Sequence, residues 1–174
     1  FFFHHGLNNR LPEMIRSKGV SFAEAGYWAA IPTTISIISA LLIPRFATTE
    51  RRVLVMGLLI LAAGLATTLL HTSPGFQLAF GLCLQGLARG AMMTVALLML
   101  VEIPNVGPKR AGTAGGLFFT AAEIGGVTGP LVIGFLHDLT GDFSYPLHVL
   151  TVVTFLLLGL LLTLQKTLKH DLIN

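Results

Sequence analysis

Residues 53–70 read VLVMGLLILAAGLATTLL and residues 76–101 read FQLAFGLCLQGLARGAMMTVALLMLV, with only the segment HTSPG between them. A helix that crosses about 30 Å of hydrocarbon at 1.5 Å per residue needs about 20 residues, so each stretch can span a bilayer. Three further apolar stretches cover residues 25–44, 113–136 and 149–164. We therefore predict an all-α protein, a polytopic transmembrane helix bundle that forms one domain over residues 1–174.

The composition of the chain supports a membrane protein. Apolar residues make up 53% of the sequence and charged residues only 11%, whereas about a quarter of the residues of a typical soluble domain are charged. The mean hydropathy is +0.80. The alternative is a set of buried core helices in a soluble protein.

Lysine and arginine are distributed unequally between the two faces. Connections between consecutive spans alternate between the faces of the membrane, and the cytoplasmic face carries the excess of Lys and Arg. One face holds Arg45, Arg51, Arg52, Lys109, Arg110, Lys166 and Lys169, and the other holds Arg10, Arg16 and Lys18. This bias places the C-terminus in the cytoplasm, and we expect the membrane to be the plasma (cell inner) membrane.

The start of the chain looks like the end of a helix that begins further upstream. Phe1 has no initiator Met, basic region or cleavage site around it, so no signal peptide is indicated. We interpret residues 1–9 as the last turns of a truncated helix that ends in Asn8 and Asn9, and the chain as a fragment. A connection over residues 10–24 follows, with a short interfacial helix at residues 12–15. Ser21 and Glu24 have the spacing of a capping box, which predicts a helix start at this point.

Two charges lie in the middle of apolar spans, Arg89 in residues 76–101 and Glu123 in residues 113–136. A charge in the hydrocarbon costs a few kcal/mol or more unless it faces protein, water or a partner, so each is a candidate functional residue. The helical rise places both roughly 15–18 Å from the same face. We expect Arg89 and Glu123 either to pair or to face one polar cavity. Gln85 and Thr120 extend the two polar patches.

These charges have a functional and a structural interpretation. In the functional one, Arg89 attracts an anionic group of a substrate and Glu123 takes up a proton or breaks the pair. In the structural one, the ion pair only locks two helices together. Asn8 and Asn9 are further candidates for the cavity. So are the polar residues Thr33, Thr34 and Ser36 of the 25–44 span, although Ser and Thr also bond to carbonyls of their own helix.

Small residues at a spacing of four indicate close helix contacts. This spacing lets membrane helices approach backbone to backbone. The residues expected to serve helix packing are Gly86, Gly90, Gly112, Gly116, Gly125, Gly129, Pro130 and Gly134.

The sequence gives no indication of an enzyme. It has no convincing nucleophile–base set, no His cluster with metal-ligand spacing, and a single Cys83 in mid-span. We interpret His4 and His5 as a cavity rim or as a face of the truncated helix. The glycines after Lys109 and Arg110 lack the Lys-Ser/Thr ending of a phosphate loop. A basic stripe with interleaved aromatic residues is also absent, so we expect no nucleic acid, cofactor or metal.

Residues 125–141, GGVTGPLVIGFLHDLTG, resemble the eleventh helix and following turn of the major facilitator superfamily. The matching residues are Gly125, Gly129, Pro130, Gly134, Asp138, Thr140 and Gly141. Residues 6–26 are also similar to the start of the C-terminal half in the cyanate and nitroimidazole permease branch. The basic loop motif of the superfamily is only partly kept: Arg51 and Arg52 are present, but Ala47, Thr48 and Glu50 replace its other residues, which puts a cytoplasmic latch in doubt.

The resemblance implies the C-terminal half of a major facilitator fold, from the end of the seventh helix through the twelfth. It implies that the seventh, eighth, tenth and eleventh helices line a cavity and that the ninth and twelfth face outward. We accordingly predict a secondary transporter that moves a small organic anion or drug-like compound by alternating access, with protons as the candidate coupling ion. Its partners are the lipid bilayer, the substrate and the missing N-terminal half. The alternatives are a structural or receptor-like membrane protein and a channel, and a channel lacks its expected filter motif.

Overall fold

The computed structural model describes residues 1–103 and 106–171, and all of its secondary structure in that part of the chain is helical. Six helices follow one another as α1 (Phe2–Arg16), α2 (Phe22–Phe46), α3 (Arg52–Leu69), α4 (Phe76–Val101), α5 (Gly107–Thr140) and α6 (Ser144–Asp171). Helices α2 to α6 are each long and apolar enough to cross a membrane. The prediction of an all-α bundle with several membrane-spanning helices is confirmed.

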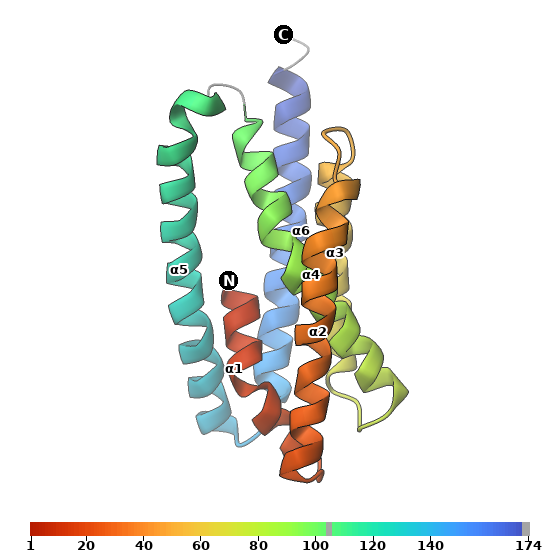
Figure 1. Ribbon diagram of the computed structural model, residues 1–174. Coiled ribbons are helices and arrows are strands. Elements are labelled where there is room, and N and C mark those ends of the chain that lie inside the picture. Colours follow the sequence, from red (N-terminus) through yellow and green to blue (C-terminus); the bar gives the residue numbers. More distant parts are fainter. Residues whose placement is uncertain (104–105, 172–174) are drawn as a thin grey trace.

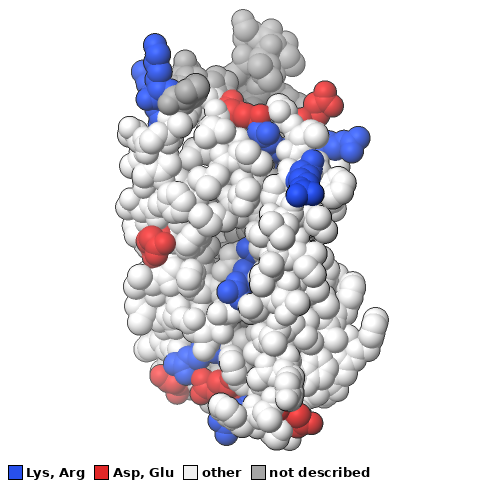
Figure 2. All heavy atoms as spheres, in the orientation of Figure 1, with Lys and Arg blue, Asp and Glu red and all other residues white. Residues whose placement is uncertain are grey.

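The helices run roughly parallel or antiparallel to one another and pack in pairs (Figure 1). Helix α4 packs against α2 and α3, α3 packs against α6, and α1 packs against α5 and α2. The N-terminus lies inside the bundle at about half its height, because α1 is short and sits between its long neighbours (Figure 1). Charged side chains gather at the two ends of the bundle and are sparse in the band between them, as a transmembrane bundle requires (Figure 2).

Helix α1 corrects the sequence prediction for the first connection. It does not end at Asn9 but continues through Pro12 to Arg16, so the predicted connection over residues 10–24 shrinks to residues 17–21 and no separate interfacial helix forms. The reason is tertiary packing: the buried side chains Phe3, Leu7, Leu11, Met14 and Ile15 recur along one face of a single continuous helix.

The other helix ends extend the predicted spans. The capping box at Ser21 is confirmed, since Ser21 Oγ accepts from the backbone N–H of Glu24 and the Glu24 carboxylate accepts from the backbone N–H of Ser21. Helices α5 and α6 begin and end several residues outside the apolar stretches 113–136 and 149–164. Hydropathy marks only the part of a helix that crosses the hydrocarbon, whereas the helical backbone continues into the headgroup layer. Helix α5 ends at Gly141, whose positive φ of 73° suits a glycine C-cap.

Helices α2 and α5 are the least buried of the five long helices. In each of them only 11% of an apolar 18-residue segment is buried inside the described part of the chain, compared with 33% for α3. Their free surfaces are therefore available to lipid, to water or to further protein.

Candidate functional site

A small cavity lies between α1 and α4 at the level of Arg89. Its volume is about 170 Å³. Arg89 reaches across it from α4, and its Nη1 donates a hydrogen bond of 2.6 Å to Oδ1 of Asn8 on α1. The lining residues are Phe1, His4, His5, Asn8, Arg89 and Met93.

The guanidinium of Arg89 is only partly satisfied by this contact. Asn8 offers a neutral amide oxygen, and among the described residues no carboxylate forms an ion pair with Arg89. A guanidinium carries five N–H donors in a planar fork that matches a carboxylate or phosphate. Because a cation in mid-membrane is costly without a countercharge, this arrangement can attract an anion into the cavity.

The helix face beside Arg89 holds further unused hydrogen-bonding groups. Gln85, one turn earlier on α4, is fully buried, and neither its amide nitrogen nor its amide oxygen has a partner among the described residues. Nδ1 of His4 is likewise buried without a partner. A buried polar group left unpaired costs about 1–3 kcal/mol, which a polar ligand or a rearranged neighbour would recover.

Glu123 lies on the other side of α1 and does not pair with Arg89. Its carboxylate borders an open, mostly apolar groove along α5, together with Thr120 and Thr128. The surroundings of Gly126 show that Glu123 lies near His5. A Cβ added at Gly126 would be 3.6 Å from Glu123 Oε2 and 3.5 Å from His5 Cδ2. Of the two arrangements predicted for Arg89 and Glu123, direct pairing is therefore absent, and both charges flank the first turns of α1.

The remaining polar candidates are not gathered at Arg89. Thr33, Thr34 and Asn9 are exposed, and the hydroxyl of Thr34 donates to the carbonyl of Ala30 in its own helix. Two further candidate hydroxyls also donate within their own helices, Ser36 to Thr33 O on α2 and Thr120 to Gly116 O on α5. These bonds satisfy the hydroxyls without any partner helix.

Two of the glycine pairs lie at close helix crossings. Gly86 and Gly90 of α4 face the α2 backbone from Pro32 to Ser36, and a Cβ at Gly86 would lie 2.7 Å from the carbonyl oxygen of Pro32. Gly125 and Gly129 of α5 face the backbone of Phe2 on α1.

The other predicted packing residues of α5 have different surroundings. Gly134 faces the guanidinium of Arg10, and Pro130, half-buried, lies inside α5 without ending it. Gly112 and Gly116 have no other heavy atom within 4 Å of an added Cβ, so they contact no neighbouring helix among the described residues.

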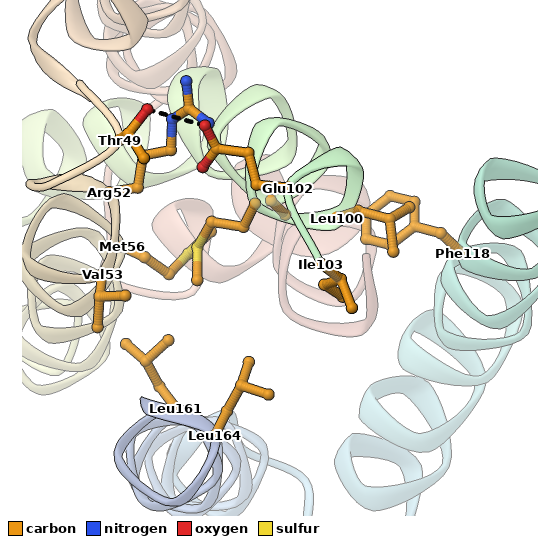
Figure 3. A pocket seen from close by; sticks show the side chains of 12 residues that line it. Thr49, Arg52, Val53, Met56, Leu100, Glu102, Ile103, Phe118, Leu161 and Leu164 are labelled. Atoms are coloured by element: carbon orange, nitrogen blue, oxygen red, sulfur yellow. Dashed lines mark hydrogen bonds and ion pairs between the residues drawn. The ribbon is translucent and has the colours of Figure 1, made fainter. Parts of the chain in front are cut away.

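A second cavity, of about 500 Å³, lies at the end of the bundle where α2 joins α3 (Figure 3). The ion pair between Arg52 and Glu102 borders it, and Thr49 donates to Glu102 at 2.8 Å. Arg52 also donates to the carbonyls of Ala47 and Leu98, which ties the α2–α3 connection to α4. Its other walls are apolar, including Val53, Met56, Leu100, Ile103, Phe118, Leu161 and Leu164. Sequence reasoning missed this pair because only the fold brings the start of α3 beside the end of α4.

The sequence did not identify the histidines of the Arg89 cavity as candidate functional residues. We interpreted His4 and His5 only as a cavity rim or a helix face, and the structure places both in the lining with Arg89. Met93, one turn after Arg89, completes that lining. Their position in the sequence within one turn of the candidate Asn8 could have indicated that they lie near the same cavity.

Comparisons with known proteins agree with this architecture. A model of the Major Facilitator Superfamily matches residues 5–172. A quinolone resistance transporter of Acinetobacter baumannii is 30% identical over 91% of this chain and 36% of its own length. From Bacillus subtilis (strain 168), the uncharacterized transporter YycB is 25% identical over 85% of the chain and 37% of its own length. The probable galactarate/D-glucarate transporter GudP of the same strain is 26% identical over 75% of the chain and 30% of its own length. The chain thus matches about a third of the length of these relatives.

Proposed function

The chain belongs to the major facilitator superfamily of transporters, and on this premise we propose that it is the C-terminal half of a secondary transporter for a small organic anion. The observation that carries the proposal is the mid-membrane guanidinium of Arg89, which lines a cavity with Asn8 and has no carboxylate partner among the described residues. Secondary transporters bind their substrates near the bilayer midplane, between two structural repeats.

The size of the cavity supports an incomplete site. Ligand pockets have volumes of about 300–1,000 Å³, whereas the Arg89 cavity has about 170 Å³. An N-terminal half would supply the opposite wall. The free surfaces of α2 and α5, including Gly112 and Gly116 with nothing packed on them, are where we place that contact. Movement of the two halves against each other would open the site to each side in turn.

The compounds in the names of two relatives are compatible with an anion. Galactarate and glucarate are dicarboxylates, and quinolone drugs carry a carboxylate. In our proposal such a carboxylate accepts from the free N–H groups of Arg89, and the unpaired amide of Gln85 offers a further contact one turn away.

Proton coupling is assigned to Glu123. Its carboxylate borders an open groove on α5 and lies near His5, which belongs to the Arg89 cavity. A proton taken up by Glu123 would remove a negative charge near the anion site and so favour anion entry. We place the C-terminus in the cytoplasm of the cell and the protein in its plasma membrane, from the Lys and Arg bias of the connections.

The test uses the full-length transporter and its uptake of galactarate and of a fluoroquinolone. Charge-assisted hydrogen bonds contribute about 1.5–3 kcal/mol, so Arg89→Ala should reduce uptake about tenfold or more at equal folded yield. Arg89→Lys keeps the charge and loses the planar fork, so it should retain part of the uptake. Arg45→Ala, which removes an exposed arginine outside the cavity and outside the basic loop motif, is the matched control. Normal uptake by the Ala variant would overturn the proposal.

The second candidate function is a structural membrane protein, and the Arg89–Asn8 hydrogen bond favours it because this bond joins α4 to α1. In that case Arg89→Ala would lower the folded yield, and the variant protein that still folds would show the same uptake as the wild type. Glu123→Gln separates the readings further, since only a transporter would lose the dependence of its uptake on the proton gradient.

A further inference from the structure

Two histidines far apart in the sequence meet at the end of the bundle opposite to the Arg52–Glu102 pair. His71 lies in the connection between α3 and α4, and His148 lies in the first turns of α6. Their ring centroids are 5.0 Å apart and their planes are inclined by 53°. Both residues are exposed, so a solute in the aqueous phase can reach both rings.

The ring of His148 is held in one orientation. Its Nδ1 lies 2.6 Å from the carbonyl oxygen of Ser144, one turn earlier in α6. A carbonyl oxygen can only accept, so Nδ1 carries the hydrogen and Nε2 keeps its lone pair in the neutral imidazole. A histidine that donates one ring N–H to a backbone carbonyl is the usual arrangement of a metal-binding histidine.

We propose that His71 and His148 together bind one divalent transition-metal ion of the zinc type. Zinc–nitrogen bonds are 2.0–2.1 Å long and tetrahedral, so two ligating nitrogens lie about 3.4 Å from each other, a separation that rings with centroids 5.0 Å apart can reach. Imidazole ligands favour Zn²⁺, Ni²⁺ or Cu²⁺ over Mg²⁺ and Ca²⁺, which prefer oxygen.

The surroundings make this an open site of two protein ligands. Within the described residues there is no group of three or more His, Cys, Asp or Glu side chains that could hold a metal. Water therefore fills the other positions, and the ion exchanges with solution. Asp142 acts on His71 as a negative charge, and Lys18, whose Nζ donates to the carbonyl of Thr72 at 2.8 Å, acts as a positive one.

A bound ion would join the α3–α4 connection to the start of α6. Helices α3 and α6 already pack against each other, so the ion would add a link between elements that are in place. Any ligand that binds the folded protein and not the unfolded chain raises the midpoint of thermal unfolding as its concentration rises. Metal binding should therefore appear as a saturable stabilisation.

The experiment titrates ZnCl2 into chelator-stripped, detergent-purified protein and follows binding by calorimetry and thermal unfolding by circular dichroism. The wild type should bind one ion that His71→Ala, His71→Gln and His148→Ala each abolish, together with the rise in the unfolding midpoint. His5→Ala, which removes an exposed histidine elsewhere, should bind zinc as the wild type does. Because both residues are exposed, we expect the variants to fold without metal, which their unfolding curves check.

Three results would overturn the proposal. One is a wild type without saturable binding at millimolar zinc, and another is binding that survives in the His71 and His148 variants. The third is a loss of binding on substitution at only one of the two positions, which would show that the ion does not bridge the pair.

Discussion

Replacing Gly90 by Ala tests whether the contact between α2 and α4 is as close as the structure has it. A Cβ at Gly90 would lie 2.8 Å from the carbonyl carbon of Ser36 and 2.9 Å from its Cα, and closer still to its carbonyl oxygen. Carbon atoms pack best at about 3.5–4.0 Å, so the two helices would have to separate by about 0.6 Å or more. The atoms in the way are backbone atoms, which cannot rotate aside.

The expected magnitude follows from two opposing effects. Overpacking a well-packed contact costs about 1–3 kcal/mol, and backbone atoms put Gly90→Ala at the upper end of that range. Alanine favours a helix over glycine by about 1 kcal/mol, so the net loss in free energy of unfolding is about 2 kcal/mol. Gly159→Ala is the matched control, because it lies inside α6 with no other heavy atom within 4 Å of the added Cβ, and it should gain up to about 1 kcal/mol.

Thermal unfolding of the purified protein in detergent measures both variants. A chain of this size shifts its unfolding midpoint by about 2–4 °C per kcal/mol, so Gly90→Ala should fall by about 4–8 °C and Gly159→Ala should rise by about 2–4 °C. In Gly86→Ala the added Cβ would meet Pro32 and Ile35 of α2, so the unfolding midpoint of this variant should also fall. A Gly90→Ala midpoint equal to or above that of Gly159→Ala would refute the close backbone contact.

Polar contacts at the bundle ends and between α2 and α4 allow three more measurements. Arg52→Ala should lower the free energy of unfolding by about 2 kcal/mol. A double-mutant cycle with Glu102→Ala should assign only about 0.2–1 kcal/mol of that to the ion pair, whose Glu102 side chain is 36% exposed. Ser39→Ala removes an interhelical hydrogen bond of 2.7 Å to a carbonyl of α4 and should cost about 1 kcal/mol in chemical unfolding. Partial desolvation of the exposed His71 ring lowers its pKa below the ordinary 6.5; His148 and Lys18 lower it further, and Asp142 opposes them. The folded protein thus favours the neutral ring over the protonated one. His71 therefore does not reduce the free energy of unfolding above pH 6.5, and it lowers this free energy as the pH falls below 6.5. The unfolding midpoint in metal-free buffer should fall less between pH 7.5 and 5.5 for His71→Gln than for the wild type.

Hydropathy predicted the five long helices because a bilayer imposes one strong requirement on every span. The same reasoning failed at α1, where Gly6, Asn8, Asn9 and Pro12 are poor helix formers. Buried contacts of Leu7 and the rest of that face with α5 and α2 outweigh these local preferences. The spacing of Phe3, Leu7 and Leu11 already has the period of a helix face, but residues 1–16 alone do not show which helices that face contacts.

The candidate site could also be predicted only in part from the sequence. Its most important residue, Arg89, was identifiable from cost alone, since a charge in the middle of an apolar span demands an explanation. Its partner was not, because Asn8 lies 81 residues earlier and only the packing of α1 brings it within 2.6 Å. Depth along the helices could place Arg89 and Glu123 at one level. Whether they touch depends on the rotation of α4 and α5 about their axes, which two polar residues per helix do not define.

The short helix α1 is therefore central to the proposed mechanism. Asn8 and His5 border the cavity of Arg89, while His5 on the same helix approaches Glu123. A substrate anion that displaces Asn8 from Arg89 would remove one tie between α1 and α4, whereas the tight contact of Phe2 with Gly125 and Gly129 would keep α1 on α5. In the proposed mechanism α1 and α5 would move as one unit against α4, and the charge on Glu123 would move together with α1. Coupling between anion and proton then needs no direct contact between Arg89 and Glu123, which agrees with the absence of an ion pair between them among the described residues.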